Sequence, residues 1–172
     1  MASRLVKLTT SDDQTFEVAR DVIKHSNTVN TLITDLGMDD EDAEIIPIPL
    51  PNVASAHLKL VINWCEQHKD DEPVKEEEEK DDTVYEERPK YEIPQWDQDF
   101  FLPLSRADLF NLMLAANYMD IKLLLKYLVV TVANQIRGKN NLEMCEYFGV
   151  EHDFTPAEME MIKKDNAVEI PL

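Results

Sequence analysis

Two apolar helical segments between Ser105 and Gly138 constrain the fold of this chain more than any other feature. The second segment, Ile121 to Ile136, places aliphatic side chains on nearly every side of a helix, more than one core-facing stripe requires. It is too short, and too often interrupted by polar residues, to cross a bilayer, which takes roughly 20 predominantly apolar residues. The rest of the protein, or a partner, must therefore cover this helix.

The charge of the chain narrows its class of partner. Its 172 residues carry a formal net charge of -18. This balance argues against nucleic acid as a partner, because phosphate binding requires clustered Lys and Arg. The residues from Met1 to Lys7 lack the apolar core of a secretory signal, and no later run suits a membrane span. We therefore expect a protein of the cytoplasm and nucleus that has no membrane partner.

Composition also argues against catalysis, metals and cofactors. With only 3 glycines the chain contains neither a dinucleotide fingerprint nor a phosphate-binding loop. Cys65 and His68 have the spacing of half a metal site, but no matching pair accompanies them, so we expect no metal and an exposed His68. His25 and His57 lack a neighbouring nucleophile and are predicted to be surface residues. Cys65 and Cys145 are predicted to be free, buried thiols, and the chain is predicted not to be an enzyme.

Alternating apolar residues on both sides of Ser11–Asp13 predict an amino-terminal β-hairpin. Two short helices should follow between Asp21 and Leu36, broken near Ser26, and Gly37 suits the end of the second.

Prolines alternate with aliphatic residues from Ile46 to Pro51, which predicts an edge strand with Ile46, Ile48 and Leu50 on one face. Asn52 is then expected to cap a helix that extends to His68.

Acidic residues dominate the stretch from Asp70 to Glu92, where twelve acids stand against four basic residues. Such a segment cannot bury enough apolar surface to offset its ordering entropy, so we predict a disordered loop. A docking tail for a basic partner is the functional alternative.

Helix-capping patterns mark the carboxyl-terminal half as a helical array. Ser105 is predicted to cap a helix that has Asp108 at its third position. Thr155 is predicted to cap a later helix, with Pro156 at its first position and Glu158 completing a capping box.

Several sequence blocks, in order along nearly the whole chain, resemble the Skp family, the S-phase kinase-associated adaptors of SCF ubiquitin ligases. These blocks are Asp35–Glu41, Pro49–Val53, Trp64–Cys65 with His68–Asp71, Ile93–Gln98, Leu114–Lys122, Thr131–Lys139 and Asp153–Thr155.

The resemblance implies an α/β fold, a BTB/POZ domain shared with elongin C, followed by a helical extension that binds F-box motifs. The implied divisions are 1–69 and 93–120 for the two parts of the BTB/POZ domain, 70–92 for the acidic loop and 121–172 for the extension. In that family the BTB part binds a cullin, and the extension holds the F-box of a substrate receptor.

Site residues follow from the resemblance position by position. The family positions that contact the cullin correspond to Asn117 and Tyr118, with Leu36 and Met38 as weaker candidates, and the preceding Leu114 to Ala116 are expected to be buried. The apolar positions of the F-box groove correspond to Met113, Leu125, Val129, Val132, Ala133, Ile136, Phe148 and Val150. Val168 stands where the family has a Trp that lies over the bound F-box, and an aliphatic side chain cannot replace that aromatic ring.

Two functions of different classes remain after the sequence is considered. The first is a non-catalytic adaptor that links F-box proteins to a cullin in SCF-type ubiquitin ligases. The alternative is a self-associating BTB scaffold that acts outside a ligase. Both functions are compatible with a homodimer of the free protein.

Overall fold

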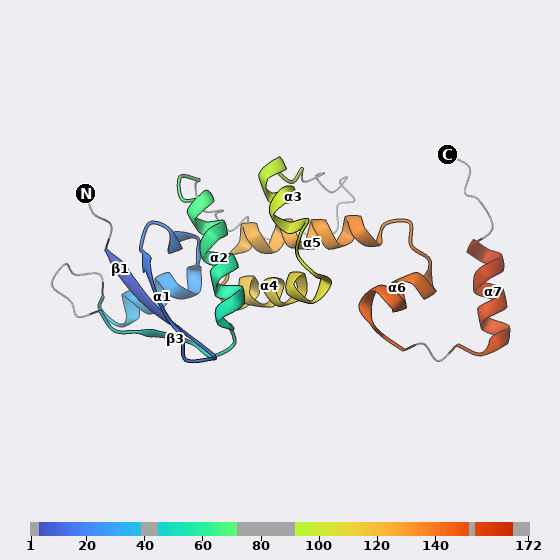
Figure 1. Ribbon diagram of the computed structural model, residues 1–172, viewed down its shortest axis with the longest axis horizontal. Helices are drawn as coiled ribbons and strands as arrows, with labels where there is room; N and C mark the ends of the chain where they lie inside the picture. The colour runs from blue at the N-terminus through green and yellow to red at the C-terminus, as the bar shows by residue number, and fades with distance from the viewer. Residues whose placement is uncertain (1–3, 39–44, 72–91, 152–153, 167–172) are drawn as a thin grey trace, which may run out of the picture. The chain divides into compact units, whose positions relative to one another are not determined.

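The structure of the protein is a computed structural model that describes residues 4–38, 45–71, 92–151 and 154–166 (Figure 1). The chain forms two compact units, residues 1–131 and 132–172, and helix α5 (Lys122–Ile136) runs across their boundary. The predicted disordered loop lies outside the described residues, apart from its ends at Asp70, Asp71 and Glu92.

The predicted amino-terminal hairpin is confirmed. Strands β1 (Leu5–Thr10) and β2 (Thr15–Ala19) pair in antiparallel fashion, and β3 (Ile48–Leu50) lies parallel to β1 on its other side. The strand order β2-β1-β3 puts the proline-containing strand at an edge, as predicted, because Pro has no N–H to donate to a neighbour. Both aliphatic residues of β3 are buried, whereas Ile46, expected on the same face, precedes the strand and is 41 % exposed.

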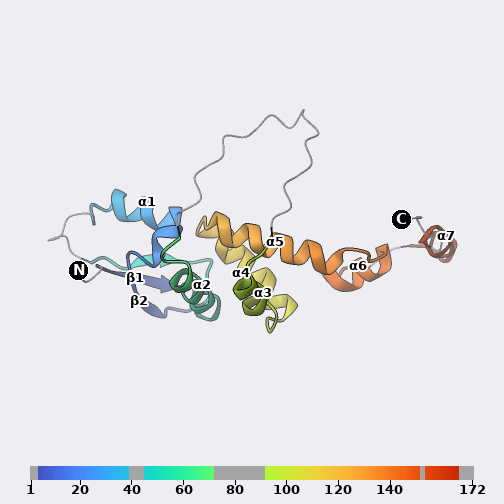
Figure 2. The same ribbon diagram turned by 90° about the horizontal axis from the view of Figure 1, so that it is seen from above.

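Two short helical segments follow the hairpin, as the sequence predicts. A 3-10 turn, η1 (Ile23–His25), and helix α1 (Asn27–Asp35) are separated at Ser26, which caps α1. Gly37 follows with a φ of +64°, a left-handed conformation that favours glycine after a helix end. Figure 2 shows α1 beside one face of the small sheet.

Helix α2 (Ser55–Gln67) is capped from elsewhere in the chain. The prediction that Asn52 caps it is wrong, since Ala54 occupies the N-cap position and has no capping side chain. The Asp12 carboxylate, in the β1–β2 turn, accepts hydrogen bonds instead from the Ser55 N–H (2.9 Å) and the Ser55 hydroxyl (2.6 Å). The first turn of α2 is thereby attached to the hairpin.

These hydrogen bonds make part of the stability depend on pH. The Ser55 hydroxyl, followed by a Thr10 side chain, lowers the pKa of Asp12 from 3.8 to about 2. Because the pKa of Asp12 is lower in the folded state than in the unfolded state, the ionised carboxylate stabilises the fold. This stabilisation is complete above the unfolded pKa and is lost as pH falls from about 4 to about 2. In a double-mutant cycle of Asp12→Asn and Ser55→Ala, measured by urea unfolding, we expect a coupling free energy at pH 7 that shrinks at pH 3. An equal coupling free energy at pH 7 and at pH 3 would contradict the role given to the Asp12–Ser55 hydrogen bonds.

Three further helices follow, and the last of them crosses into the second unit. Helix α3 (Gln95–Phe101) leads to α4 (Arg106–Tyr118), and α5 runs back alongside α4 in Figures 1 and 2. The predicted cap of α4 is confirmed, since the Ser105 hydroxyl accepts from the Asp108 N–H at 3.1 Å.

Buried polar side chains connect the end of α2 to α3, the two elements that flank the acidic segment. His68, predicted to be exposed, is only 8 % exposed because it stacks on the Trp64 ring, with 4.1 Å between centroids. Its Nδ1 lies 2.7 Å from Asp71 and its Nε2 lies 3.2 Å from the fully buried Asp97, which also accepts from Trp64 Nε1 at 2.6 Å.

His25 extends this cluster and is also buried, not at the surface as predicted. Its Nε2 lies 2.7 Å from the carbonyl oxygen of His68, an acceptor, so this nitrogen carries the proton. Burial lowers the pKa of His25 below its ordinary value, which favours the neutral ring.

Removal of the buried carboxylate should destabilise the protein strongly. In Asp97→Ala, the indole N–H of Trp64 and one nitrogen of His68 would lose their partner, at a cost of about 3–5 kcal/mol. We expect a Tm lower by roughly 10 °C in a circular-dichroism melt. Asp99→Ala, on the exposed side of the same helix, is the matched control and should change the Tm little. A small effect of Asp97→Ala would contradict a role for this cluster in stability.

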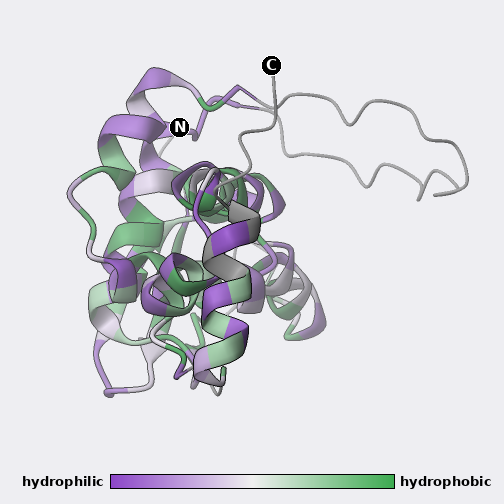
Figure 3. Ribbon diagram, turned by 90° about the vertical axis from the view of Figure 1, so that its right-hand side faces the viewer, coloured by the Kyte–Doolittle hydropathy of each residue, from purple (hydrophilic) through white to green (hydrophobic). Residues whose placement is uncertain are grey.

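In the described part of the second unit, the end of α5 is followed by α6 (Asn141–Phe148) and α7 (Pro156–Asn166). Hydrophilic and hydrophobic residues alternate along the helices in Figure 3. The predicted capping box of α7 is confirmed, since the Thr155 N–H donates to Glu158 at 2.8 Å and the Glu158 N–H to the Thr155 hydroxyl at 3.4 Å. Helix α6 has a capping box of its own between Asn140 and Glu143.

Both cysteines are free, as predicted. Cys65 is buried, and desolvation raises the pKa of its thiol to about 12, whereas Cys145 is only half-buried. Within the described ranges, no helix is both long and apolar enough for a membrane span, and no three potential ligands are grouped to hold a metal ion.

Candidate protein-binding surfaces

Asn117 and Tyr118, the main candidates for contact with a cullin, form the last turn of α4. Asn117 is exposed and Tyr118 is half-buried, so both side chains have surface that a partner can reach. The weaker candidates are placed differently. Leu36 follows the C-terminal end of α1, roughly 15 Å from the start of that helix, and is 44 % exposed. Met38 is buried at 3 % exposure.

A sharp turn follows α4. The Asp120 N–H donates to the Asn117 carbonyl at 3.1 Å, and the Ile121 N–H donates to the Ala116 carbonyl at 2.9 Å. Asp120 has a φ of 49°, so these bonds form the left-handed Schellman ending of a helix, with Asp where Gly is commonest. The turn reverses the chain into α5.

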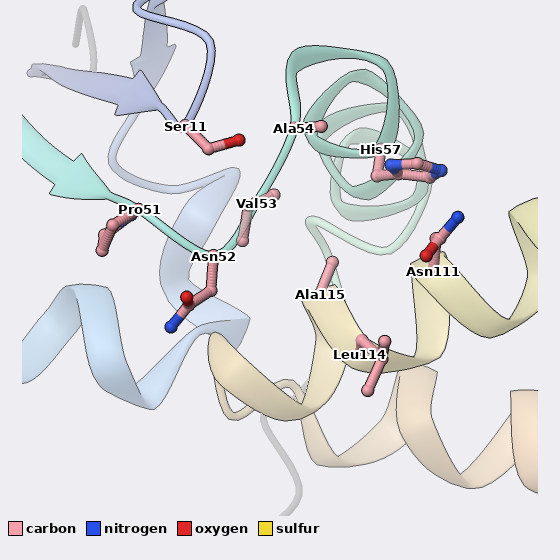
Figure 4. A pocket seen from close by; sticks show the side chains of 9 residues that line it. All are labelled: Ser11, Pro51, Asn52, Val53, Ala54, His57, Asn111, Leu114 and Ala115. Atoms are coloured by element: carbon pink, nitrogen blue, oxygen red, sulfur yellow. The ribbon is translucent and has the colours of Figure 1, made fainter.

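Leu114 lies one turn before Asn117 on α4. Its side chain is 65 % exposed, which corrects the expectation that residues Leu114 to Ala116 are all buried; only the two alanines are. Leu114 lines a cavity of about 340 Å³ between the β1–β2 turn, the start of α2 and α4 (Figure 4). The exposed side of α4 therefore continues from the candidate residues into a concave surface.

His57 forms part of the wall of this cavity, facing Asn111 in Figure 4. Predicted to be a surface residue, it is half-buried, with a side chain that is 16 % exposed. Its Nε2 lies 3.6 Å from an Asp108 oxygen and has no hydrogen-bond partner. The Ser105 hydroxyl holds the pKa of Asp108 below its usual value, which keeps a carboxylate beside the His57 ring.

Helix α5 divides its apolar residues between core and surface. Leu124 and Leu128, together with Ile121 just before the helix, are fully or almost fully buried and attach it to the first unit. Val129, a candidate for F-box binding, is 49 % exposed, and Leu125, one turn earlier, is half-buried. Met113 on α4 is also half-buried.

The remaining F-box candidates belong to the second unit. Phe148 and Val150, on either side of the left-handed Gly149, are 45 % and 60 % exposed. Ala133 is exposed, Ile136 is half-buried, and Val132 is buried at 8 % exposure. Val168 lies outside the described residues. Exposed apolar side chains of this kind suit a protein partner better than a small polar ligand.

Among the exposed apolar residues that were not singled out from the sequence, two stand out by their exposure. Leu102, after α3, is 83 % exposed, and Met161, in α7, is 66 % exposed. Neither belongs to a motif, and apolar periodicity alone does not separate such residues from core positions.

Comparison with known proteins matches both ends of the chain to one family. Residues 4–70 match the tetramerisation domain of the Skp1 family, and residues 122–169 match the dimerisation domain of the same family. A Skp1-related protein of Caenorhabditis elegans is 46% identical over 165 residues, which cover 95% of this chain and 90% of that protein.

Two further relatives are named as members of the SCF ubiquitin ligase complex. The SCF ubiquitin ligase complex protein SKP1a of Dictyostelium discoideum is 41% identical, over 94% of this chain and 93% of that protein. The E3 ubiquitin ligase complex SCF subunit sconC of Arthroderma benhamiae is 40% identical, over 96% of this chain and 94% of that protein.

Proposed function

The chain belongs to the Skp1 family, and from this premise we propose that it is a non-catalytic adaptor that links F-box substrate receptors to a cullin in SCF-type ubiquitin ligases. The observation that carries the proposal is the similarity, over more than nine-tenths of the chain, to proteins named as subunits of the SCF complex. An adaptor of this kind acts in the cytoplasm and nucleus.

Separate surfaces support the adaptor role. The end of α4 offers Asn117, Tyr118 and the exposed Leu114 beside a cavity, a combination of polar rim and apolar contact typical of protein interfaces. We assign this surface to the cullin. Val129 on α5 and, separately, Phe148 and Val150 beside Gly149 are assigned as apolar contacts of the F-box.

Reconstitution with purified components tests the proposal. The protein should form a ternary complex with an amino-terminal cullin fragment and an F-box protein, measured by size-exclusion chromatography with light scattering. Neither partner should bind the other without the protein. Failure to bind either partner would refute the adaptor role.

The domain names of the family, tetramerisation and dimerisation, favour self-association as a second candidate function. Sedimentation velocity over a range of concentrations tests it. A monomer at all concentrations would refute self-association, and an oligomer that excludes both partners would support the scaffold over the adaptor.

A further inference from the structure

The end of α4 is held in place by side chains from the start of α1, some 90 residues earlier in the chain. The last carbonyl groups of a helix have no partner inside the helix and usually bond to water or to a cap. Here the Thr28 hydroxyl donates to the Tyr118 carbonyl at 3.0 Å, and the Ser26 hydroxyl donates to the Met119 carbonyl at 2.6 Å. The backbone that carries the cullin candidates is thus bonded to a different helix.

Ser26 connects the two helix ends through a single hydroxyl group. Its oxygen accepts from the Val29 N–H at 3.2 Å, which caps α1, while its proton is donated to Met119. The side chain is fully buried, so water does not compete for either bond. The N-terminus of α1 and the C-terminus of α4 are therefore joined at fixed geometry.

Asn27 holds the turn that follows. Its side-chain amide donates to the Asp120 carboxylate at 2.8 Å, and its backbone N–H donates to the Asp120 carbonyl at 3.4 Å. Asp120 occupies the left-handed region, which costs free energy for any residue other than glycine and persists where surrounding contacts support it. We call Ser26, Asn27 and Thr28, with these bonds, the α1 clamp.

We infer that the α1 clamp positions the cullin-binding end of α4, holding the backbone from Tyr118 to Asp120 in one conformation before a partner arrives. The inference rests on the proposed function. Binding to a preorganised surface avoids the entropy cost of ordering it, so the clamp raises affinity without touching the partner. Ser26, Asn27 and Thr28 are positioning residues in this account.

Weakening the α1 clamp should affect the cullin surface and leave the F-box surface unchanged. Helix α5 begins only two residues after Asp120, but Leu124 and Leu128, farther along the helix, are fully buried and hold it in the core. Loosening the end of α4 should therefore leave the F-box surface of α5 in place.

Thr28 is the member of the clamp to change. Thr28→Val replaces the hydroxyl with a methyl group of similar size and keeps the branched shape of the side chain, at a half-buried position. Thr28→Ser keeps the hydroxyl and is the matched control. Dissociation constants for a cullin fragment and for an F-box fragment would be measured alongside amide hydrogen exchange at Met119, Asp120 and Ile121.

We expect cullin binding about threefold to tenfold weaker in Thr28→Val, the cost of ordering a loosened segment. Exchange at the three amides should be faster, and F-box affinity should be unchanged. Thr28→Ser should match the unmodified protein in all three measurements.

Three results would overturn the inference alone: cullin affinity equal in the Val and Ser variants, equal loss of both partners, or unchanged exchange at the turn. A protein that binds no cullin even when unmodified would overturn the proposed function and this inference with it.

Discussion

Replacing both Asn117 and Tyr118 with lysine should weaken binding to a cullin fragment at least 100-fold, to order of magnitude, if the end of α4 is the cullin surface. The two ammonium groups would stand where a partner must remove water, and lysine is strongly hydrated. A loss of about 3 kcal/mol is typical when two central interface residues are disrupted. The fold should tolerate the change, because lysine suits the last turn of a helix and the backbone bonds of the turn remain.

Isothermal titration with cullin and F-box fragments would measure both affinities, and a thermal melt would report stability. Asn63→Lys, which places one such lysine on an exposed position of α2, is the control for added positive charge and should leave both affinities unchanged. If the double variant kept its cullin affinity, or lost both partners equally, the assignment of separate surfaces would be wrong.

Aspartate at Val129 or at Phe148 should reduce F-box affinity by at least about 30-fold in each case. Both side chains are substantially exposed, 49 % and 45 %, so the free protein should fold normally with a carboxylate at either position. Once an F-box helix covers the site, an unpaired carboxylate is desolvated at a cost of about 2 kcal/mol or more. Binding by fluorescence anisotropy of a labelled F-box fragment would measure the loss.

Asn141→Asp adds the same charge at an exposed position of α6 and serves as the control for Phe148→Asp. Cullin affinity should be unchanged in all three variants. Normal F-box affinity in both the Val129 and Phe148 variants would remove these residues from the proposed F-box contacts.

Features that depend on a few consecutive residues could be predicted from the sequence. The hairpin, the helix break at Ser26, the edge position of the proline-rich strand and the caps at Ser105 and Thr155 are all found where expected. Each follows from backbone conformation or from hydrogen bonds to near neighbours in the chain. The candidate site residues came from family resemblance, which supplies positions but not their surroundings.

Burial and long-range partners were decided by the tertiary structure. His68 and Asp97 are 29 residues apart in sequence, and Asp12 caps a helix 43 residues away, so no local pattern contains these pairs. Apolar spacing likewise did not distinguish the exposed Leu114 from the buried Leu112, since both suit the same helix. The sequence by itself determined which segments form helices and strands and how α4 and α7 are capped, because those signals act within a few residues, whereas the start of α2 depends on the distant Asp12. Only the packing of distant segments determined which polar groups are buried together, which aliphatic residues remain exposed, and how α1 holds the end of α4.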